Sequence, residues 1–171
     1  MVGSATFPKQ HEGRGGYTID TDFGHSGISG SITDQALSNY MPHIVLLMIG
    51  TNDINGNVDV ANAPTRLENL INDITTAAPA SLVVVAAIIP TNNDGTNVAV
   101  QAYNASMKDL VDTMVNNGKH VVFLDNYANF SQDSNYKSVL MADGLHPNTA
   151  GYAVLAQSFY GVIGDLLPAA L

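Results

Sequence analysis

The stretch "DGLHPNTAGY", residues 143–152, places an aspartate three residues before a histidine that a proline follows. On a tight loop, the carboxylate of Asp143 can accept a hydrogen bond from Nδ1 of His146. Such a bond fixes the tautomer of the ring and leaves Nε2 to act as a general base. Pro147 suits the first position of a helix, so His146 is expected at a rigid helix entrance. A capped helix start would explain the same residues without any chemistry.

Two other segments carry polar or glycine-rich turns. The segment "IGTNDING" (49–56) contains a Gly-x-Asn-Asp turn, in which the amide of Asn52 can act as a hydrogen-bond donor. An ordinary polar turn, whose Asn and Asp side chains bond their own backbone, is the alternative. The segment "KQHEGRGGYTID" (9–20) contains three glycines, which permit positive φ angles and a close approach of the backbone to a ligand. A backbone N–H of this segment can be a second donor.

Three apolar runs predict buried parallel strands, because each is rich in β-branched residues and lacks polar alternation. The runs are 43–50, 81–90 and 120–126. Helical patterns lie between and around them, at 32–40, 62–79, 100–120 (with Gly118 as its stop) and from 148 to about 167. In the last helix, Tyr152, Leu155 and Phe159 are expected to face the core.

The alternation of strands and helices predicts a three-layer α/β fold with right-handed crossovers. In such folds, ligands bind beyond the carboxyl ends of the strands. We expect one domain over residues 1–171, because no linker or internal repeat is visible. The Asn52 turn follows the first run directly, which places it at the expected ligand edge.

Composition restricts the possible partners and chemistry. The chain has 15 acidic and 6 basic residues and a net charge of −9, which argues against nucleic acid or an anionic membrane as a partner. It contains no cysteine, so disulfides, thiolate metal sites and cysteine nucleophiles are excluded. Only 12% of the residues are charged. A neutral polar surface of this kind favours a secreted protein that acts on neutral substrates.

In this order and at strand ends, the three motifs resemble those of the SGNH (GDSL-type) hydrolases. "HEGRGGYTID", "IGTNDI" and "DGLHPNTAGY" are most similar to the motifs of carbohydrate esterases that remove acetyl groups from xylan. The resemblance runs from Val2 to about Leu167. It implies a flavodoxin-like three-layer fold with a parallel sheet, no cofactor, and hydrolysis of short-chain or acetylated carbohydrate esters by a Ser-His-Asp triad.

Carried over by position, the resemblance makes His146 the general base and Asp143 its orienting partner. Asn52 and the backbone N–H of Gly16 become the donors of an oxyanion hole, which must be preorganised toward the charge that develops in the transition state. Two residues beside these donors are expected to contact the substrate: Tyr17 and Thr51. For Tyr17, packing in the core is the alternative.

The nucleophilic serine that the resemblance implies has no matching motif in this sequence. In the family it lies in a Gly-Asp-Ser motif after the first strand, and the chain contains no Gly-Asp-Ser. Ser4 is one candidate, but only twelve positions separate it from Gly16. The family places a helix and a strand between these two points, and a parallel crossover alone takes a dozen or more residues. Ser26 is a second candidate, but its surroundings lack the second glycine of a Gly-x-Ser-x-Gly elbow.

The segment "MVGS" is more similar to the end of the family's second strand. On this interpretation the first strand and the first helix of the fold are missing. Val2–Ser4 and Ile44–Ile49 must then pair directly, or a strand edge stays open. Because an open apolar edge favours pairing with another chain, we expect a homodimer or a strand-exchanged oligomer.

Two other functions fit parts of the sequence. A non-catalytic carbohydrate-binding or scaffold module would keep the donors and need no nucleophile. A metal hydrolase using His11, Asp143 and His146 is the least favoured. A zinc site needs three or four convergent ligands, and the chain has neither His-x-His nor His-Glu-x-x-His.

Overall fold

The computed structural model describes residues 11–21 and 24–167. Its sheet contains three parallel strands in the order β1 (Ile44–Leu47), β2 (Leu82–Ala86) and β3 (Val121–Leu124). Val45 pairs with Val83, and Val83 pairs with Val121. The helices are α1 (Ser31–Tyr40), α2 (Thr51–Asn55), η1 (Val60–Asn62), α3 (Ala63–Ala77), α4 (Asp94–Asn116), α5 (Asn126–Ser131), α6 (Tyr136–Val139), α7 (Thr149–Ile163) and η2 (Gly164–Leu166). The predicted strand–helix alternation is confirmed.

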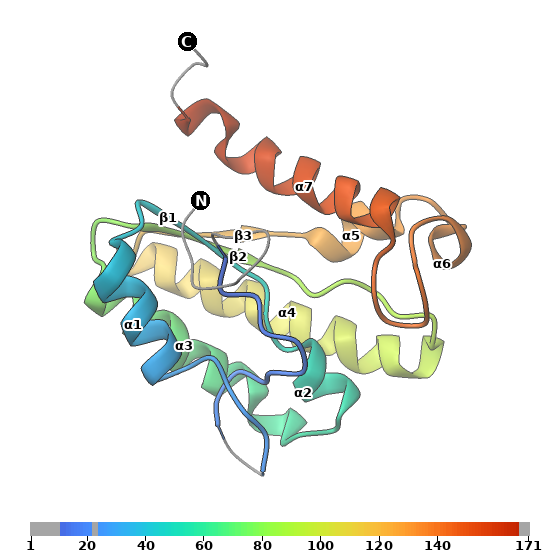
Figure 1. Cartoon of the computed structure of the whole chain (residues 1–171), viewed down its shortest axis with the longest axis horizontal. Helices are drawn as coiled ribbons and strands as arrows, with labels where there is room; N and C mark the ends of the chain where they lie inside the picture. The colour runs from blue at the N-terminus through green and yellow to red at the C-terminus, as the bar shows by residue number, and fades with distance from the viewer. Residues whose placement is uncertain (1–10, 22–23, 168–171) are drawn as a thin grey trace.

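Helices cover the two faces of the sheet unequally (Figure 1). Val83 and Val85 of β2 belong to the large core formed with α3 and α4, whereas Val84 and Ala86 face the opposite side and pack under Phe159 and other residues of α7. Alternate residues of a strand point to opposite faces, so β2 is buried on both. This explains why its sequence is uniformly apolar. The result is the predicted three-layer α/β arrangement.

Helix boundaries follow local caps that the apolar pattern does not show. α4 begins at Asp94, six residues before the predicted start, because the side chain of Asn93 accepts a hydrogen bond from the N–H of Thr96. Gly118 adopts the left-handed conformation expected of a helix stop, with φ 79°. The prediction that Tyr152 faces the core is wrong. It is 57% exposed, although Leu155, one turn later on the same face of α7, is buried.

Within the described residues, the outer edge of β1 has no partner strand. Leu46 lies on the face that α7 covers over β2 and β3, but it is 42% exposed. The predicted pairing partner, Val2–Ser4, lies outside the described residues, so direct pairing stays a prediction. None of the described helices has the length and hydrophobicity to cross a membrane.

Candidate active site

Asp143 and His146 are in contact, as the sequence predicts. Nδ1 of His146 lies 3.0 Å from Oδ2 of Asp143. The other carboxylate oxygen, Oδ1, accepts hydrogen bonds from the backbone N–H groups of Leu145 and His146, both at 2.7 Å. The imidazole side chain is 67% exposed, and Nε2 has no hydrogen-bond partner among the described residues. The ring is therefore held on one side and open on the other.

The charge state of Asp143 determines the tautomer of the histidine. The backbone N–H groups of His146 and Leu145, followed by the bond to the imidazole, lower the pKa of Asp143 to about 2. A carboxylate that is ionised at neutral pH can only accept, so Nδ1 carries the proton of a neutral ring. Nε2 then presents a lone pair to solvent, which is the arrangement a general base needs.

The loop that carries this pair is held at both ends by backbone contacts. Met141 and Pro147 form an antiparallel bridge, and the N–H of Ala142 donates to the carbonyl of His146 at 2.8 Å. Asn148 caps α7 by accepting from the N–H groups of Ala150 and Gly151. The same side chain donates to the carbonyl of Val139 at 3.0 Å. Residues 146–151 ("HPNTAG") thus serve mainly to anchor the loop at the start of α7.

The Asn52 turn begins directly after β1 at a residue that must be glycine. Gly50 has φ 113°, and a Cβ there would lie 2.5 Å from the ring of Tyr103. The hydroxyl of Tyr103 donates to the carbonyl of Ile49 at 3.2 Å. Burial raises the pKa of this phenol well above its ordinary value, so it remains a donor. Tyr103 of α4 therefore fixes the point where the chain leaves β1 and enters α2.

Asn52 and Asp53 contact alternate residues of the glycine-rich segment. Nδ2 of Asn52 donates to the carbonyl of Tyr17 at 2.8 Å, and the buried carboxylate of Asp53 accepts from the N–H of Ile19 at 3.2 Å. Gly16 is exposed with φ 79°, and its N–H has no partner among the described residues. An amide group carries two hydrogens, so Asn52 keeps one donor free. Both predicted oxyanion donors thus lie in segments that are bonded to one another.

Sequence reasoning missed the group that holds this junction together. Arg66 of α3 is buried and donates from Nη1 to Asp53 at 2.6 Å and to Asp20 at 2.8 Å. Burial opposes its charge, but the hydrogen bonds that the guanidinium donates to the two carboxylates outweigh this and raise the pKa of Arg66 above its ordinary value. The sequence feature that could have indicated this group is an arginine directly beside Leu67, on the apolar face of a helix that was predicted from periodicity alone.

The two halves of the site lie at the same end of the sheet. Asn52 follows β1, while the Asp143–His146 loop is bonded to the segment after β2. In that segment, the N–H of Asn92 donates to the carbonyl of Gly144 at 2.9 Å. β1 and β2 are parallel neighbours, so their carboxyl ends meet at one edge. That the imidazole and the two donors face one shared hollow stays a prediction.

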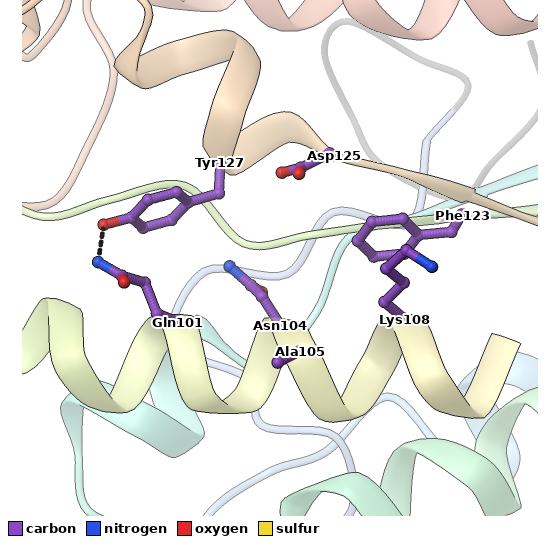
Figure 2. A pocket seen from close by; sticks show the side chains of 7 residues that line it. All are labelled: Gln101, Asn104, Ala105, Lys108, Phe123, Asp125 and Tyr127. Carbon is purple, nitrogen blue, oxygen red and sulfur yellow. Dashed lines mark hydrogen bonds between the residues drawn. The ribbon is translucent and has the colours of Figure 1, made fainter. Parts of the chain in front are cut away.

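Two pockets of about 220 Å³ lie elsewhere and contain none of the predicted site residues. Figure 2 shows the first, between α4 and the β3–α5 junction, with Tyr127 and Phe123 on its walls and the carboxylate of Asp125 near them. There, Nε2 of Gln101 donates to the hydroxyl of Tyr127 at 2.7 Å. The second is lined by residues of α1, 41–43 and 77–81.

The remaining candidates have these positions. Ser4 lies outside the described residues. Ser26 is exposed, and its carbonyl accepts from the N–H of Thr18, where the glycine-rich segment forms a bridge with Gly27. Nδ1 of His11 accepts from the N–H of Gly13 at 3.0 Å. Across residues 11–21 and 24–167, no three His, Asp or Glu side chains are grouped so that they could hold a metal ion.

Tyr17 and Thr51, the predicted substrate contacts, are both half-buried.

Residues 3–154 match the GDSL-like Lipase/Acylhydrolase family. The chain belongs to this family. The structure is similar to that of the Clostridium thermocellum family 3 carbohydrate esterase, with 31% identity and a TM-score of 0.77 over 96% of this chain and 77% of that one. A Multidomain esterase of Ruminococcus flavefaciens is 28% identical over an alignment of 178 positions that covers 97% of this chain. The resemblance to SGNH hydrolases close to carbohydrate esterases is confirmed.

The matched relatives are longer than this chain. It spans 22% of the length of the Ruminococcus flavefaciens protein. It spans 55% of the length of a curated Acetivibrio thermocellus protein that is named endoglucanase X. The two sequences are 34% identical over 135 residues.

Proposed function

We propose that this protein hydrolyses carboxylic esters, with short-chain esters or acetylated carbohydrates as its substrates. The observation that carries the proposal is the Asp143–His146 contact. An ionised carboxylate holds Nδ1, and Nε2 has no hydrogen-bond partner among residues 11–21 and 24–167. Family membership and the similarity to a carbohydrate esterase support the reaction class and the kind of substrate.

The proposed reaction is an acyl transfer in two steps. Nε2 of His146 takes a proton from a serine hydroxyl as the oxygen attacks the ester carbonyl. The N–H of Gly16 and the free amide hydrogen of Asn52 stabilise the resulting oxyanion. The imidazolium then gives its proton to the leaving alcohol. Water, activated by the same nitrogen, attacks the acyl-enzyme, and collapse of this second intermediate releases the acid and the serine.

Ser4 is the serine we propose for the first test, because it precedes the glycine-rich segment as the family nucleophile does. The absence of Gly-Asp-Ser favours the second candidate function, a carbohydrate-binding module that retains the donors but does not turn over. An active Ser4 would refute the spacing argument against it. Secretion, favoured by the neutral polar composition, likewise remains a proposal.

The deciding experiment is turnover of p-nitrophenyl acetate and of acetylated xylo-oligosaccharides by the purified chain, compared with His146→Ala, Ser4→Ala and Ser26→Ala. His146 is exposed, so its alanine variant should fold as the wild type does. We expect His146→Ala to lose at least 10²-fold in kcat, because general-base catalysis contributes roughly 10²–10⁴-fold. Unchanged turnover in His146→Ala would refute triad chemistry. Binding of the oligosaccharide without turnover in the wild type would favour the binding module.

A further inference from the structure

The guanidinium of Arg66 donates hydrogen bonds to two segments that lie outside α3. Nη1 donates to Asp53 and Asp20, and Nη2 donates to the backbone carbonyls of Val58 at 2.8 Å and Asp59 at 3.3 Å. The planar fork of an arginine suits such divergent acceptors, whereas a lysine ammonium acts as a point charge. The guanidinium thus joins the end of the Asn52 turn to the glycine-rich segment.

The helix itself is held by other residues. Leu67, Leu70 and Ile71 of α3 are buried in the large core and pack with residues of α4 and β2. These contacts do not involve the guanidinium. Removal of its fork should therefore leave α3 in place while it loosens the segments that the fork bonds.

Those segments are the ones that carry the proposed oxyanion donors. Asp53, which Arg66 holds, accepts the N–H of Ile19, and its neighbour Asn52 donates to the carbonyl of Tyr17. Asp20, which Arg66 also holds, closes the other end of the same segment. Gly16 lies in the same segment, directly before Tyr17. The relative position of the Gly16 N–H and the Asn52 amide is therefore set by the direct Asn52–Tyr17 bond and by the bonds of Asp53 and Asp20, which converge on one buried cation.

We propose that Arg66 is a positioning residue: through Asp53 and Asp20 it fixes the two oxyanion donors relative to each other. The assignment of those donors rests on the proposed ester hydrolysis, but the positioning itself does not. In this role Arg66 acts on the two donors through the carboxylates that it holds and not by contact with the substrate. Its loss should lower kcat more than it raises KM, because the charge of the oxyanion is absent from the bound ester and develops only toward the transition state.

The test compares Arg66→Lys, which keeps the charge but not the fork, with Lys108→Met. The control removes an exposed ion pair with Asp112 on α4. Hydrogen exchange by NMR then reports on single groups. In Arg66→Lys we expect exchange of the Ile19 N–H and of the Asn52 side-chain amide to accelerate at least tenfold. Backbone amides of Leu70 and Ile71 should exchange at the wild-type rate, and Lys108→Met should change none of these.

Equal acceleration of all these amides would show a merely structural role and overturn the proposal, as would no change at Ile19 and Asn52. If Arg66→Lys does not fold, Asp20→Asn replaces it. The Asp20 side chain is 32% exposed, so this variant keeps the buried Arg66–Asp53 pair and should accelerate the same two groups by a smaller factor.

Ester turnover gives the second readout. With p-nitrophenyl acetate, Arg66→Lys should lose at least tenfold in kcat while KM changes less than threefold. A wild type without turnover would refute the proposed function and leave the exchange experiment to decide the positioning role. Normal exchange at both groups together with a large loss of turnover would refute the positioning role alone.

Discussion

Gly50→Ala tests whether the close approach of Tyr103 fixes the Asn52 turn. An added Cβ would lie 2.5 Å from the ring, against 3.4–4 Å for an ordinary contact, so one of the two must move by about an ångström. Overpacking of this kind costs roughly 1–3 kcal/mol. The φ angle of 113° adds roughly 1–2 kcal/mol for a residue with a side chain. The free energy of unfolding should fall by roughly 2–5 kcal/mol.

For a chain of this size, such a loss lowers the midpoint of thermal unfolding by roughly 4–20 °C. Circular dichroism measures it, and Gly161→Ala is the matched control. Gly161 lies in α7, where a Cβ would meet nothing within 4 Å, so alanine should be neutral or stabilise by up to about 1 kcal/mol. A displacement of about an ångström in the turn should also lower ester turnover by about 10²-fold.

A double variant separates the contact from the backbone strain. In a Tyr103→Val background the ring is absent, so Gly50→Ala should cost about 1–3 kcal/mol less than it does in the wild type. The strain of the positive φ angle remains in both. The reasoning is refuted if Gly50→Ala is as mild as Gly161→Ala, or if its cost is the same in the two backgrounds.

Two further predictions concern other parts of the molecule. The pKa of Asp143, followed by ¹³C NMR of its carboxyl carbon, should be about 2, and in His146→Ala it should stay below 3.8, because the two backbone donors remain. The stabilisation that these bonds give is therefore present above about pH 4 and is lost as the pH falls through 2; an ordinary value in His146→Ala would contradict this assignment. Because the outer edge of β1 has no partner strand in the part of the chain that the structure describes, we predict that the wild type sediments as a dimer and that Leu46→Lys, which adds a charge at this edge, is a monomer. A monomeric wild type would contradict the predicted association.

The fold could be predicted because it depends on apolar residues that recur in regular runs along the sequence. Strands such as β2 are buried on both faces and therefore lack polar residues, which is visible without coordinates. The ends of the helices depend on single side chains instead, as the Asn93 cap of α4 illustrates. Tyr152 was misassigned because helical spacing identifies a face but does not show how far the neighbouring layer extends over it.

The site was predicted in part for a similar reason. Asp143 and His146 are close in sequence, so a tight loop almost forces their contact, and spacing alone was sufficient. The contacts of Asp53 with Ile19 and Arg66 join positions far apart in the chain. Only the tertiary fold brings them together, and no local pattern marks them.

The two halves of the site are held in different ways, and this determines which substitutions test chemistry. The Asp143–His146 pair is exposed and bonded mainly through its own loop, so truncation of His146 removes a functional group and little else. The Asn52 turn instead rests on Gly50, Tyr103 and the buried Arg66–Asp53 pair, where each change also alters stability. A loss of turnover in His146→Ala is thus direct evidence for the mechanism. The same loss in a variant of the turn is informative only beside its unfolding curve and its amide exchange.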